Sequence, residues 1–494
     1  MDQSAIDSLR SRKIAPQGHL IEGRTVPASS GETMDVITPI DGTQLTTIAR
    51  GTAEDMNAAI ASARRAFEDG RWRNMPPAAR KRILHKWADL IEANALELAV
   101  LGVRDNGTEI SMAIKAEPGS AAATIRYYGE AIDKIYGEIA PTQNDILGMI
   151  HHEPVGVVGA IVPWNFPLMI GAWKIGPALA VGNSVVVKPP ETASLTLVRL
   201  AQLALEAGIP AGVLNVVTGE GAVVGEAMAL SMDVDVLAFT GSGATGRRLL
   251  QYSARSNLKR VYLELGGKSP HIIFNDCDDL DKAARLVASG IFRNSGQVCV
   301  AGSRLLVQRD LEEDFLKAVV KASRAMQPGD PLRLDTQIGA INSIAQLEQN
   351  LATVELAVQE GAEIVSGGTR SLEETGGYYM APTIVSGVKP AHSLFRKEVF
   401  GPVLAVTSFD DEAEAVHLAN GTDYGLAAGV WTSNLSRAHR MIRSLRCGVV
   451  HVNTYGGPDV TVPLGGVGQS GNGSDKSLHA IGKYTNLKTA WIQL

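Results

Sequence analysis

The sequence predicts an α/β protein built around an open, doubly wound parallel sheet. Between residues 157 and 239, short β-rich runs alternate with helical segments, a pattern typical of parallel strands joined by crossover helices. Several of these runs end in polar or glycine-rich turns, and ligands bind open α/β sheets at the carboxyl ends of their strands. The chain has 494 residues and an apolar fraction of 45%, so it should bury a large core and form more than one domain.

The composition argues against nucleic-acid, membrane and metal-dependent functions. The formal net charge is −6 without a block of like charge, so nothing indicates binding to nucleic acid or to an anionic membrane. The apolar run 155–182 contains three prolines, Asn165 and Lys174, which would be costly in a lipid-exposed helix, and we predict buried α/β core there. The ten histidines show no HExxH or paired spacing, so no catalytic metal is expected.

Three scattered cysteines, Cys277, Cys299 and Cys447, lack CxxC spacing, and an odd number argues against a disulfide framework. Residues 1–20 are polar and lack the apolar centre of a signal peptide. We therefore expect a cytoplasmic protein whose partners are small metabolites.

The expected elements follow the chain in order. Residues 53–68 and 77–100 are predicted as amphipathic helices, and the second follows a proline pair and places Ile83, Trp87 and Ile91 on one face. A second α/β layer is expected beyond residue 299, and the β-rich segments 136–150 and 484–494 could pair across a subunit interface. The other strands are predicted at 157–162, 184–188, 213–217, 234–239, 259–265, 403–409, 427–431 and 448–453, and the other helices at 194–207, 223–230, 311–326, 344–360, 411–419 and 436–445.

Three strand ends carry residues suited to ligand binding. The strand at 157–162 runs into Pro-Trp-Asn-Phe-Pro, the one at 184–187 into Lys-Pro-Pro-Glu, and the one at 234–239 into Thr-Gly-Ser-Gly-Ala-Thr-Gly. The last contains Gly-x-Gly-x-x-Gly at Gly241, Gly243 and Gly246, which matches the dinucleotide fingerprint but also suits a plain strand-to-helix turn. In the usual fingerprint the glycine turn follows the first strand of the fold, whereas here several strands precede the glycines. Lys188 and Glu191 already supply a cation and a carboxylate suited to an adenosine ribose.

One thiol, Cys299, lies between a predicted helix and a β-rich run, with Gly296 and Gly302 on either side. Such a junction is more often exposed than buried, and the glycines let the backbone approach a ligand closely. The alternative is an inert buried cysteine, which is the commoner case for a lone cysteine. An unperturbed thiol, with a pKa of about 8.5, is only slightly ionised at neutral pH, so a nucleophilic role requires a lowered pKa or a base within reach.

Six motifs in order make the chain resemble the aldehyde dehydrogenase superfamily. They are VPWNFP (162–167), VKPPE (187–191), FTGS (239–242), ELGGKSP (264–270), GQVC (296–299) and EVFGPV (398–403). The resemblance implies an open, doubly wound, Rossmann-like NAD-binding domain (1–131 and 155–266), an α/β catalytic domain (267–467) and a small β oligomerisation element (132–154 and 476–494). It also implies a homodimer or a homotetramer.

The resemblance assigns roles to individual residues. Cys299 is similar to the nucleophile, Glu264 to the general base and Asn165 to the side-chain donor of the oxyanion hole, and Lys174 joins them as a catalytic candidate. The cofactor-binding candidates are Ile161, Val162, Pro163, Trp164, Asn165, Lys188, Glu191, Gly221, Phe239, Thr240, Gly241, Ser242, Gly246, Leu265, Glu398 and Phe400. The candidates for a mostly apolar aldehyde pocket are Phe166, Ile170, Trp173, Arg293, Val298, Val300 and Leu464.

These roles imply oxidation of an aldehyde to a carboxylic acid through a thiohemiacetal and a thioester on Cys299, with Glu264 assisting hydrolysis. NAD is the expected cofactor, because Glu191 would repel the 2′-phosphate of NADP, the less favoured alternative. Two other functions stay open: a catalytically silent NAD-binding relative, and an acylating enzyme that passes the thioester to coenzyme A. Glu264 argues against the second, since acylating members lack the base.

The C-terminal segment departs from the pattern of the family, which often has PFGG, then a lysine, and later an Arg-Glu pair. Here the first motif contains Leu464, Gly468 stands near the position of the lysine, and Ser474 with Asp475 replaces the pair. Asn486 stands where a glutamate is common. Substrate fit and subunit contacts are the properties that these departures should change.

Arg293 lies six residues before Cys299, where succinate-semialdehyde-type members carry an arginine that holds the distal carboxylate. Trp173, however, stands where those members tend to have a second arginine. Arg293 could equally cap its helix or form a structural ion pair. The sequence therefore does not predict an acidic semialdehyde as the substrate.

Overall fold

Five parallel strands form the centre of a first sheet in the computed structural model, which describes residues 2–457 and 459–494. The strand order is β11-β10-β7-β8-β9-β1-β2. The chain runs outward from β7 through β8 and β9 and then returns to the other side of β7 through β10 and β11, so a crevice forms where the order reverses. The strands are β1 His19–Ile21, β2 Arg24–Val26, β7 Val157–Ile161, β8 Ser184–Lys188, β9 Leu214–Val216, β10 Val236–Thr240 and β11 Arg260–Glu264.

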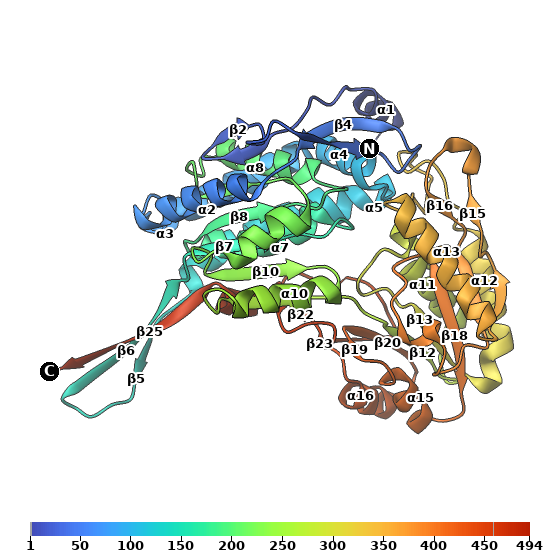
Figure 1. The fold of residues 1–494 in the computed structure, drawn as a ribbon. Helices are drawn as coiled ribbons and strands as arrows, with labels where there is room; N and C mark the ends of the chain where they lie inside the picture. Colours follow the sequence, from blue (N-terminus) through green and yellow to red (C-terminus); the bar gives the residue numbers. More distant parts are fainter. Residues whose placement is uncertain (1, 458) are drawn as a thin grey trace.

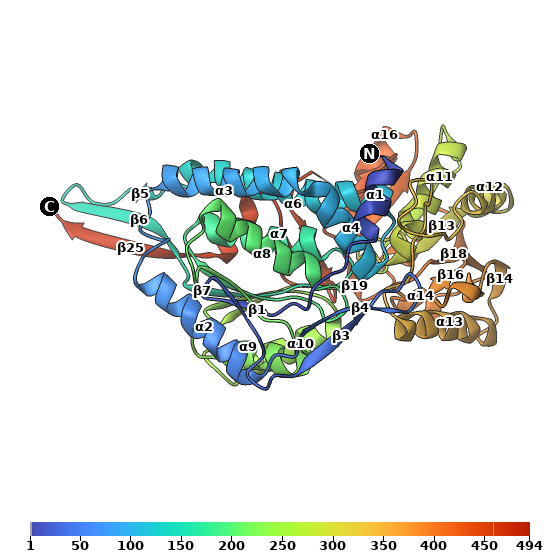
Figure 2. The same cartoon turned by 90° about the horizontal axis from the view of Figure 1, so that it is seen from above.

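Side chains alternate along β7, so each face of this sheet has its own layer of helices. Val158 and Ala160 point into a core formed with α3, α6, α7 and α8, whereas Val157 and Ile161 point into a core formed with α2, α9 and α10. Figure 2 shows the sheet between these two layers. The helices are α2 Ala53–Glu68, α3 Pro77–Ala93, α6 Ser120–Ala131, α7 Pro167–Ala180, α8 Leu195–Ala207, α9 Glu226–Leu230 and α10 Gly243–Ala254, and a π-helical turn, Gly221–Gly225, precedes α9.

The prediction of one helix over 77–100 is wrong, because the helix breaks at Asn94. The first helix ends at Ala93, and α4 runs from Ala95 to Asn106. Asn94 has φ −104° and ψ 15°, and its side-chain amide donates to the carbonyl of Leu90 at 2.7 Å. A side-chain amide that bonds to nearby backbone competes with helix continuation.

A second sheet lies beside the first, with the order β14-β17-β18-β13-β12-β20-β21 (Figure 1). All of its pairings are parallel except that of β14 with β17. Helices α11 and α12 cover one face, and α13 to α16 cover the other. The strands are β12 Pro270–Ile273, β13 Arg304–Gln308, β14 Glu363–Ser366, β17 Thr383–Ser386, β18 Val403–Phe409, β20 Ala427–Trp431 and β21 Val449–Val452, and the helices are α11 Leu280–Phe292, α12 Glu312–Arg324, α13 Ile344–Gln359, α14 Ser393–Arg396, α15 Glu412–Ala419 and α16 Leu435–Ser444.

Three strands from distant parts of the sequence form an arm that projects from the body of the protein (Figures 1 and 2). They are β5 Glu138–Ala140, β6 Ile146–Pro154 and β25 Thr485–Gln493, in the antiparallel order β25-β6-β5. The segments that the sequence predicted as strands for an interface therefore pair with each other within one chain. Leu487 and Trp491 of β25 are 66% and 65% exposed, so the arm carries apolar side chains on its surface.

The remaining elements are short. The apolar run 155–182 becomes β7 and the 14-residue helix α7, and in the described part of the chain no helix combines the length and apolarity needed to cross a membrane. The short elements are α1 Gln3–Arg10, the hairpin of β3 Thr33–Ile37 and β4 Gln44–Ala49, and the pairs β15 Arg370–Ser371 with β16 Tyr379–Met380, β19 Tyr424–Gly425 with β23 Val467–Gly468, and β22 Leu464–Gly465 with β24 Ser474–Asp475.

A buried carboxyl group, Glu117, holds the start of α7, the helix that carries several predicted pocket residues. Helix α5, Ile110–Ile114, continues through a π-helical turn, Lys115–Gly119, into α6. Glu117 lies in this turn, is 3% exposed, and its Oε2 accepts the N–H of Met169 in the first turn of α7 at 2.7 Å. Burial raises the pKa of Glu117 to about 8.

We expect Glu117→Gln to stabilise the protein at alkaline pH. The folded-state pKa lies above the ordinary value of 4.5, so the contribution of the protonated form is full below 4.5 and is lost as the pH rises through about 8. The Gln amide keeps the acceptor for Met169 and does not ionise, so its Tm should exceed that of the wild type by about 2–4 °C near pH 9, and by less near pH 6.

Differential scanning fluorimetry at both pH values measures this difference. Glu355→Gln, at an exposed position on α13, is the control and should show no pH-dependent change in Tm. An equal Tm difference at both pH values for Glu117→Gln would show that ionisation of Glu117 is not the cause.

Candidate active site

The turns that follow β7 and β10 meet two loops of the second sheet around a cavity of about 270 Å³. It opens at the crevice where the strand order reverses, the position at which open α/β sheets bind ligands. Trp164 packs edge-on against Phe400 there, with the ring centroids 5.2 Å apart. The predicted residues in the wall of this cavity are Pro163, Trp164, Asn165, Ile170, Thr240, Gly241, Ser242, Leu265, Cys299, Glu398 and Phe400.

Cys299 follows a backbone segment with an uncommon conformation. Asn294, Ser295 and Gly296 come after α11 and have φ values of 49°, 52° and 72°. This left-handed region is unfavourable for residues other than glycine, so neighbouring groups must hold it. A Cβ at Gly296 would overlap the carbonyl group of Gly401. The GQVC and EVFGPV motifs therefore pack on each other.

Two side chains from the α4–α5 junction hold this segment in place. Thr108 donates from its hydroxyl to Oδ1 of Asn294 at 2.7 Å. Glu109 accepts the N–H of Asn294 at 3.1 Å and the Nε–H of Arg293 at 3.2 Å. Burial raises the pKa of Glu109 to about 7. The thiol loop is thus fixed by groups that belong to the other half of the molecule.

Arg293 does not point into the cavities around Cys299. It pairs with Glu109, whose side chain is fully buried, and it lines a separate cavity of about 720 Å³ between α11 and α12. A buried carboxylate attracts a cation because an unpaired buried charge is costly. The structure therefore places Arg293 in the ion pair that the sequence left as the alternative, and not in the predicted aldehyde pocket.

The ELGGKSP motif lets the backbone approach both the thiol loop and Glu398. A Cβ at Gly267 would lie 2.6 Å from the carbonyl oxygen of Cys299, and a Cβ at Gly266 would overlap the carboxylate of Glu398. The N–H of Gly267 donates to Oε1 of Glu398 at 2.8 Å. Glu398 is therefore fixed in the wall of the cavity of about 270 Å³ that also contains Cys299. Burial raises its pKa to about 7.

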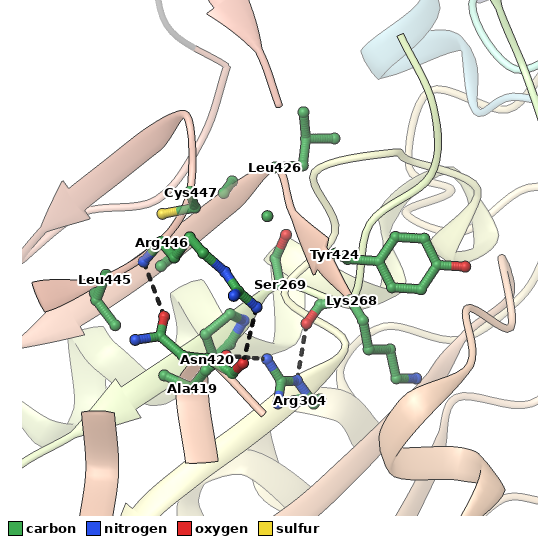
Figure 3. Close-up of a pocket in the computed structure, with 14 residues that line it drawn as sticks. Lys268, Ser269, Arg304, Ala419, Asn420, Tyr424, Leu426, Leu445, Arg446 and Cys447 are labelled. Atoms are coloured by element: carbon green, nitrogen blue, oxygen red, sulfur yellow. Dashed lines mark hydrogen bonds between the residues drawn. The ribbon is translucent and has the colours of Figure 1, made fainter. Parts of the chain in front are cut away.

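A buried arginine supports the far end of the same motif (Figure 3). Arg304 donates to the carbonyl oxygens of Lys268 at 2.8 Å and Ala419 at 2.7 Å. The pocket beside Arg304 has a volume of only about 10 Å³, and Cys299 is not among its lining residues. This pocket belongs to the support of the loop.

The Cys299 thiol is half-buried and protonated at neutral pH. Burial raises its pKa to about 12, and the nearby carboxylates of Glu398 and Glu264 add to the rise. The sequence asked for either a lowered thiol pKa or a base within reach, and the raised pKa of this thiol leaves the base. If Cys299 is a nucleophile, a base must therefore lie within reach of its thiol to accept the proton.

Glu264 ends β11 and lies opposite Thr240 of β10. It is 9% exposed, and its Oε1 has no hydrogen-bond partner among the residues that the structure describes. Burial and the negative charge of Asp475 raise the pKa of Glu264 well above 4.5. Glu264 and Cys299 line one narrow space, so a carboxyl group with a raised pKa lies near the thiol.

Lys174, Asp475 and Lys483 form a buried ion cluster next to Glu264. Lys174 Nζ lies 2.9 Å from Oδ2 of Asp475, and Lys483 Nζ bonds to Oδ1. The two lysines hold the pKa of Asp475 far below its usual range against the effect of burial. Asp475 therefore stays ionised, and Lys174 acts on Glu264 through the cluster and through its charge.

Asn165 and Cys299 both lie in the wall of the cavity of about 270 Å³. Its Nδ2 donates to the carbonyl oxygen of Gln297 at 2.9 Å, which fixes the direction of the amide. The side-chain amide of Asn165 and the N–H of Cys299 are two donors next to one thiol. An oxyanion hole needs such a pair.

The residues at the ends of β8 and β10 suit a dinucleotide. Lys188 Nζ lies 2.8 Å from Oε1 of Glu191, and the same oxygen accepts the N–H of Gly221. Ser242 caps α10 by accepting the N–H of Thr245 at 3.2 Å, and the start of a helix attracts phosphate groups. A cation and a carboxylate for a ribose, a helix N-terminus for a diphosphate and a cavity for a nicotinamide are thus present together.

Other residues that the sequence predicted for cofactor binding pack around the ends of β7 and β10. Phe239 and Ile161 are neighbours in β10 and β7, and the ring of Phe239 covers Gly241 so closely that a Cβ there would lie 2.5 Å from it. Val162 is 3% exposed at the end of β7. Gly246 lets α10 pack on Leu265, where a Cβ would lie 3.1 Å from the Leu265 side chain.

The predicted aldehyde pocket, apart from Arg293, comes together on the other side of the thiol. Phe166, Ile170, Trp173 and Leu464 share one hydrophobic cluster. Partly buried valines on both sides of Cys299 pack against this cluster, namely Val298 and Val300. Leu464, one of the departures from the family pattern, therefore lies in the pocket wall.

The structure adds site residues that the sequence did not indicate. The cavity of about 270 Å³ that contains Cys299 is also lined by Gly266, Val399, Gln346 and Gln349. The first two lie inside quoted motifs, which was a usable signal, whereas the glutamines lie on α13 without any local pattern. Lys476 was also missed, and its Nζ lies 4.8 Å from the ring centroid of Trp173.

The sequence matches that of known proteins over most of its length. The profile of the Aldehyde dehydrogenase family matches residues 25–490. The NADP/NAD-dependent aldehyde dehydrogenase PuuC of Escherichia coli (strain K12) is 49% identical over 474 residues, which cover 96% of this chain and 95% of that protein. The aminoacetaldehyde dehydrogenase of Pseudomonas aeruginosa is 47% identical over 478 residues, covering 97% and 96%.

Solved structures agree with this result. The indole-3-acetaldehyde dehydrogenase AldA of P. syringae, solved as a mutant in complex with NAD+ and IAA, is 49% identical and has a TM-score of 0.98, with 100% of both chains covered. A family profile that spans most of the chain, together with identity near one half over its whole length, leaves one conclusion. The chain belongs to the aldehyde dehydrogenase family.

Proposed function

We propose that this protein oxidises an aldehyde to the carboxylic acid with NAD, using Cys299 as the nucleophile, Glu264 as the general base and Asn165 as an oxyanion donor. As a member of the family, the chain is an oxidoreductase that acts on aldehyde groups with NAD(P). The observation that carries the residue assignment is that these side chains, from motifs far apart in the sequence, meet around one thiol.

The first part of the reaction makes the aldehyde carbon able to release a hydride. Direct loss of hydride would leave an acylium ion, so a nucleophile adds first. Cys299 transfers its proton towards Glu264 and forms a C–S bond, while the carbonyl π pair moves to oxygen. The Asn165 amide and the Cys299 N–H stabilise that oxyanion, and each such donor is worth about 3 kcal/mol of barrier. Bound NAD would supply the hydride acceptor, and Cys299 would then hold the acyl group as a thioester.

The second part releases the acid. Glu264 first releases to solvent the proton that it took from Cys299. It then accepts a proton from the water molecule that attacks the thioester carbon and passes it to the sulfur as the C–S bond breaks, so that the thiol is restored and one proton is released in each turnover. A base with a raised pKa suits this step, because a carboxylate that binds its proton more tightly is a stronger proton acceptor. The ionised Asp475 contributes to that property by raising the pKa of Glu264.

The cofactor preference rests on Glu191. Its carboxylate, held by Lys188 and by the N–H of Gly221, lies where a ribose hydroxyl would bind in this proposal. It would repel a 2′-phosphate, so NAD is the proposed cofactor, while the charge of Lys188 leaves NADP as the weaker alternative. The three cysteines are free, which supports a cytoplasmic location.

Cys299→Ala tests the nucleophile. It removes the atom that forms the thioester, so aldehyde-dependent NADH formation should fall at least about a thousand-fold. Intact-mass measurement of wild-type protein quenched during turnover should show an acyl adduct, located by peptide mapping on Cys299. Cys277→Ala, in the loop after β12 and away from the cavity, should keep wild-type rates. Activity that survives in Cys299→Ala would refute the proposal.

Glu264→Gln tests the base through its pH dependence. Because burial and Asp475 raise the pKa of Glu264 well above its ordinary value, the fraction of carboxylate grows with pH, and the wild-type steady-state rate should rise with pH until this group is fully ionised. The Gln variant should lose that pH-dependent limb and about 100-fold or more of the steady-state rate. Stopped-flow absorbance should still show one NADH per site, formed more slowly than in the wild type because Glu264 also accepts the proton of Cys299 in the first part of the reaction. Unchanged turnover would remove Glu264 from the mechanism.

We also propose that the protein forms a homodimer or a homotetramer through its arm. Strand β25 lies at the edge of the three-stranded sheet and presents Leu487 and Trp491 to the surface. An exposed edge strand with apolar side chains is prone to associate with another chain.

Trp491→Asp should shift the protein towards monomer, because it puts a charge on the proposed contact surface. Size-exclusion chromatography with light scattering measures the mass. Leu435→Asp is the matched control, since Leu435 on α16 is 72% exposed and lies outside the arm. An unchanged mass for Trp491→Asp would place the interface elsewhere.

A further inference from the structure

Lys483 brings a second lysine to the buried ion cluster beside Glu264. It is the last residue of a 3₁₀ turn, Leu478–Lys483, and is 6% exposed. Its Nζ bonds to Oδ1 of Asp475, while Lys174 Nζ lies 2.9 Å from Oδ2. Asp475 is 1% exposed, so a buried carboxylate has a separate cation on each of its oxygens.

The backbone next to Lys483 is tied to the first sheet, which fixes the place of its ammonium group. The carbonyl oxygen of Tyr484 accepts the N–H of Val155, near the start of β7, at 3.2 Å. The same oxygen accepts the side-chain amide of Asn183, directly before β8, at 3.0 Å. Solvent ions screen buried charges much less than exposed ones, so a buried cation in a fixed position acts strongly on its neighbours.

One lysine is enough to balance the charge of Asp475, so the second lysine is in excess. Glu264 and Asp475 line the same narrow space as Cys299. With Glu264 protonated, the two lysines and Asp475 leave one positive charge unbalanced, whereas with Glu264 ionised two cations face two carboxylates. Without Lys483, ionisation of Glu264 would leave an unbalanced negative charge in a buried place, which is costly.

Other ionisable side chains that face the cluster do not supply this charge. Burial raises the pKa values of the hydroxyls of Tyr128 and Tyr484 and of the Cys299 thiol, so all three are neutral at physiological pH. Lys476 is buried directly after Asp475 in the chain. The charges that act on Glu264 itself are those of Asp475, Lys483 and Lys174.

We propose that Lys483 is a positioning residue for the reaction, which supplies the second positive charge that lets Glu264 become a carboxylate beside the ionised Asp475. It acts through its bond to Asp475 and through its charge. Burial and Asp475 raise the pKa of Glu264, and the two lysines oppose that rise. Because Glu264 is the proposed general base, this inference rests on the proposed aldehyde oxidation.

Lys483→Met tests the inference through the dependence of kcat on pH in the full-length protein, with saturating NAD and an aldehyde that the wild type oxidises. The variant loses the charge and keeps an unbranched apolar side chain. Glu264 should then ionise only at higher pH, so the part of the profile in which kcat rises with pH should move up by about one pH unit. At a fixed pH on this rising part, kcat should fall about 10-fold.

Two single variants are the controls for the loss of charge. Lys483→Arg keeps the charge and should keep the rising part of the profile near its wild-type position. Lys317→Met removes a lysine at an exposed position on α12 and should leave the whole profile unchanged.

A charge-compensating pair distinguishes the loss of charge from a disturbed fold. Asp475→Asn removes the negative charge beside Glu264, so its profile should move to lower pH. The double variant Asp475→Asn/Lys483→Met leaves Lys174 alone to face Glu264, so its profile should return towards that of the wild type. An unmoved profile in Lys483→Met, or a double variant still displaced to higher pH, would overturn the proposal.

The wild type and Glu264→Gln separate this inference from the proposed function. Absence of NADH formation by the wild type, or a rise of kcat with pH that persists in Glu264→Gln, would refute the proposed function. A rise that depends on Glu264 and is insensitive to Lys483 would refute the inference alone.

Discussion

The close approach of backbone segments around Cys299 is the constraint on which the rest of the site depends. Gly296 packs on Gly401, Gly267 packs on the carbonyl group of Cys299, and Gly266 packs on the carboxylate of Glu398. A side chain at any of these glycines would displace Cys299 or the residue opposite it. This explains in physical terms why motifs separated by more than a hundred residues occur together: each one leaves space that another fills.

The buried acidic groups and the thiol differ in their pKa values because each has different charged neighbours. Asp475 has two lysines as partners and stays ionised, whereas Glu264 faces that negative charge from a buried position and binds its proton more tightly. The thiol of Cys299 is also kept neutral. The resting site therefore keeps a proton on Cys299, and Glu264, as the proposed general base, would take it without a permanently charged thiolate in the pocket.

The sequence predicted the parallel sheet and the motif-bearing residues well, because strand ends and glycine turns are local features. It failed where a side chain is directed by a distant partner. Arg293 turns towards Glu109, which is 184 residues away in the sequence. Lys476 packs on Trp173 and has a left-handed backbone conformation that no local pattern indicates. The thiol pKa depends on burial by the whole fold. The break at Asn94 was missed because the apolar spacing continues across it.

The anchoring of the thiol loop by Thr108 and Glu109 has a consequence for recombination between relatives. These residues belong to the half of the molecule that carries the first sheet, yet they bond to Asn294 and Arg293, upstream of Cys299. A chimera that grafts the first-sheet half of another member onto the second-sheet half of this chain would separate the loop from its anchors. The short α4–α5 junction would have to travel with Cys299 for the graft to keep its geometry.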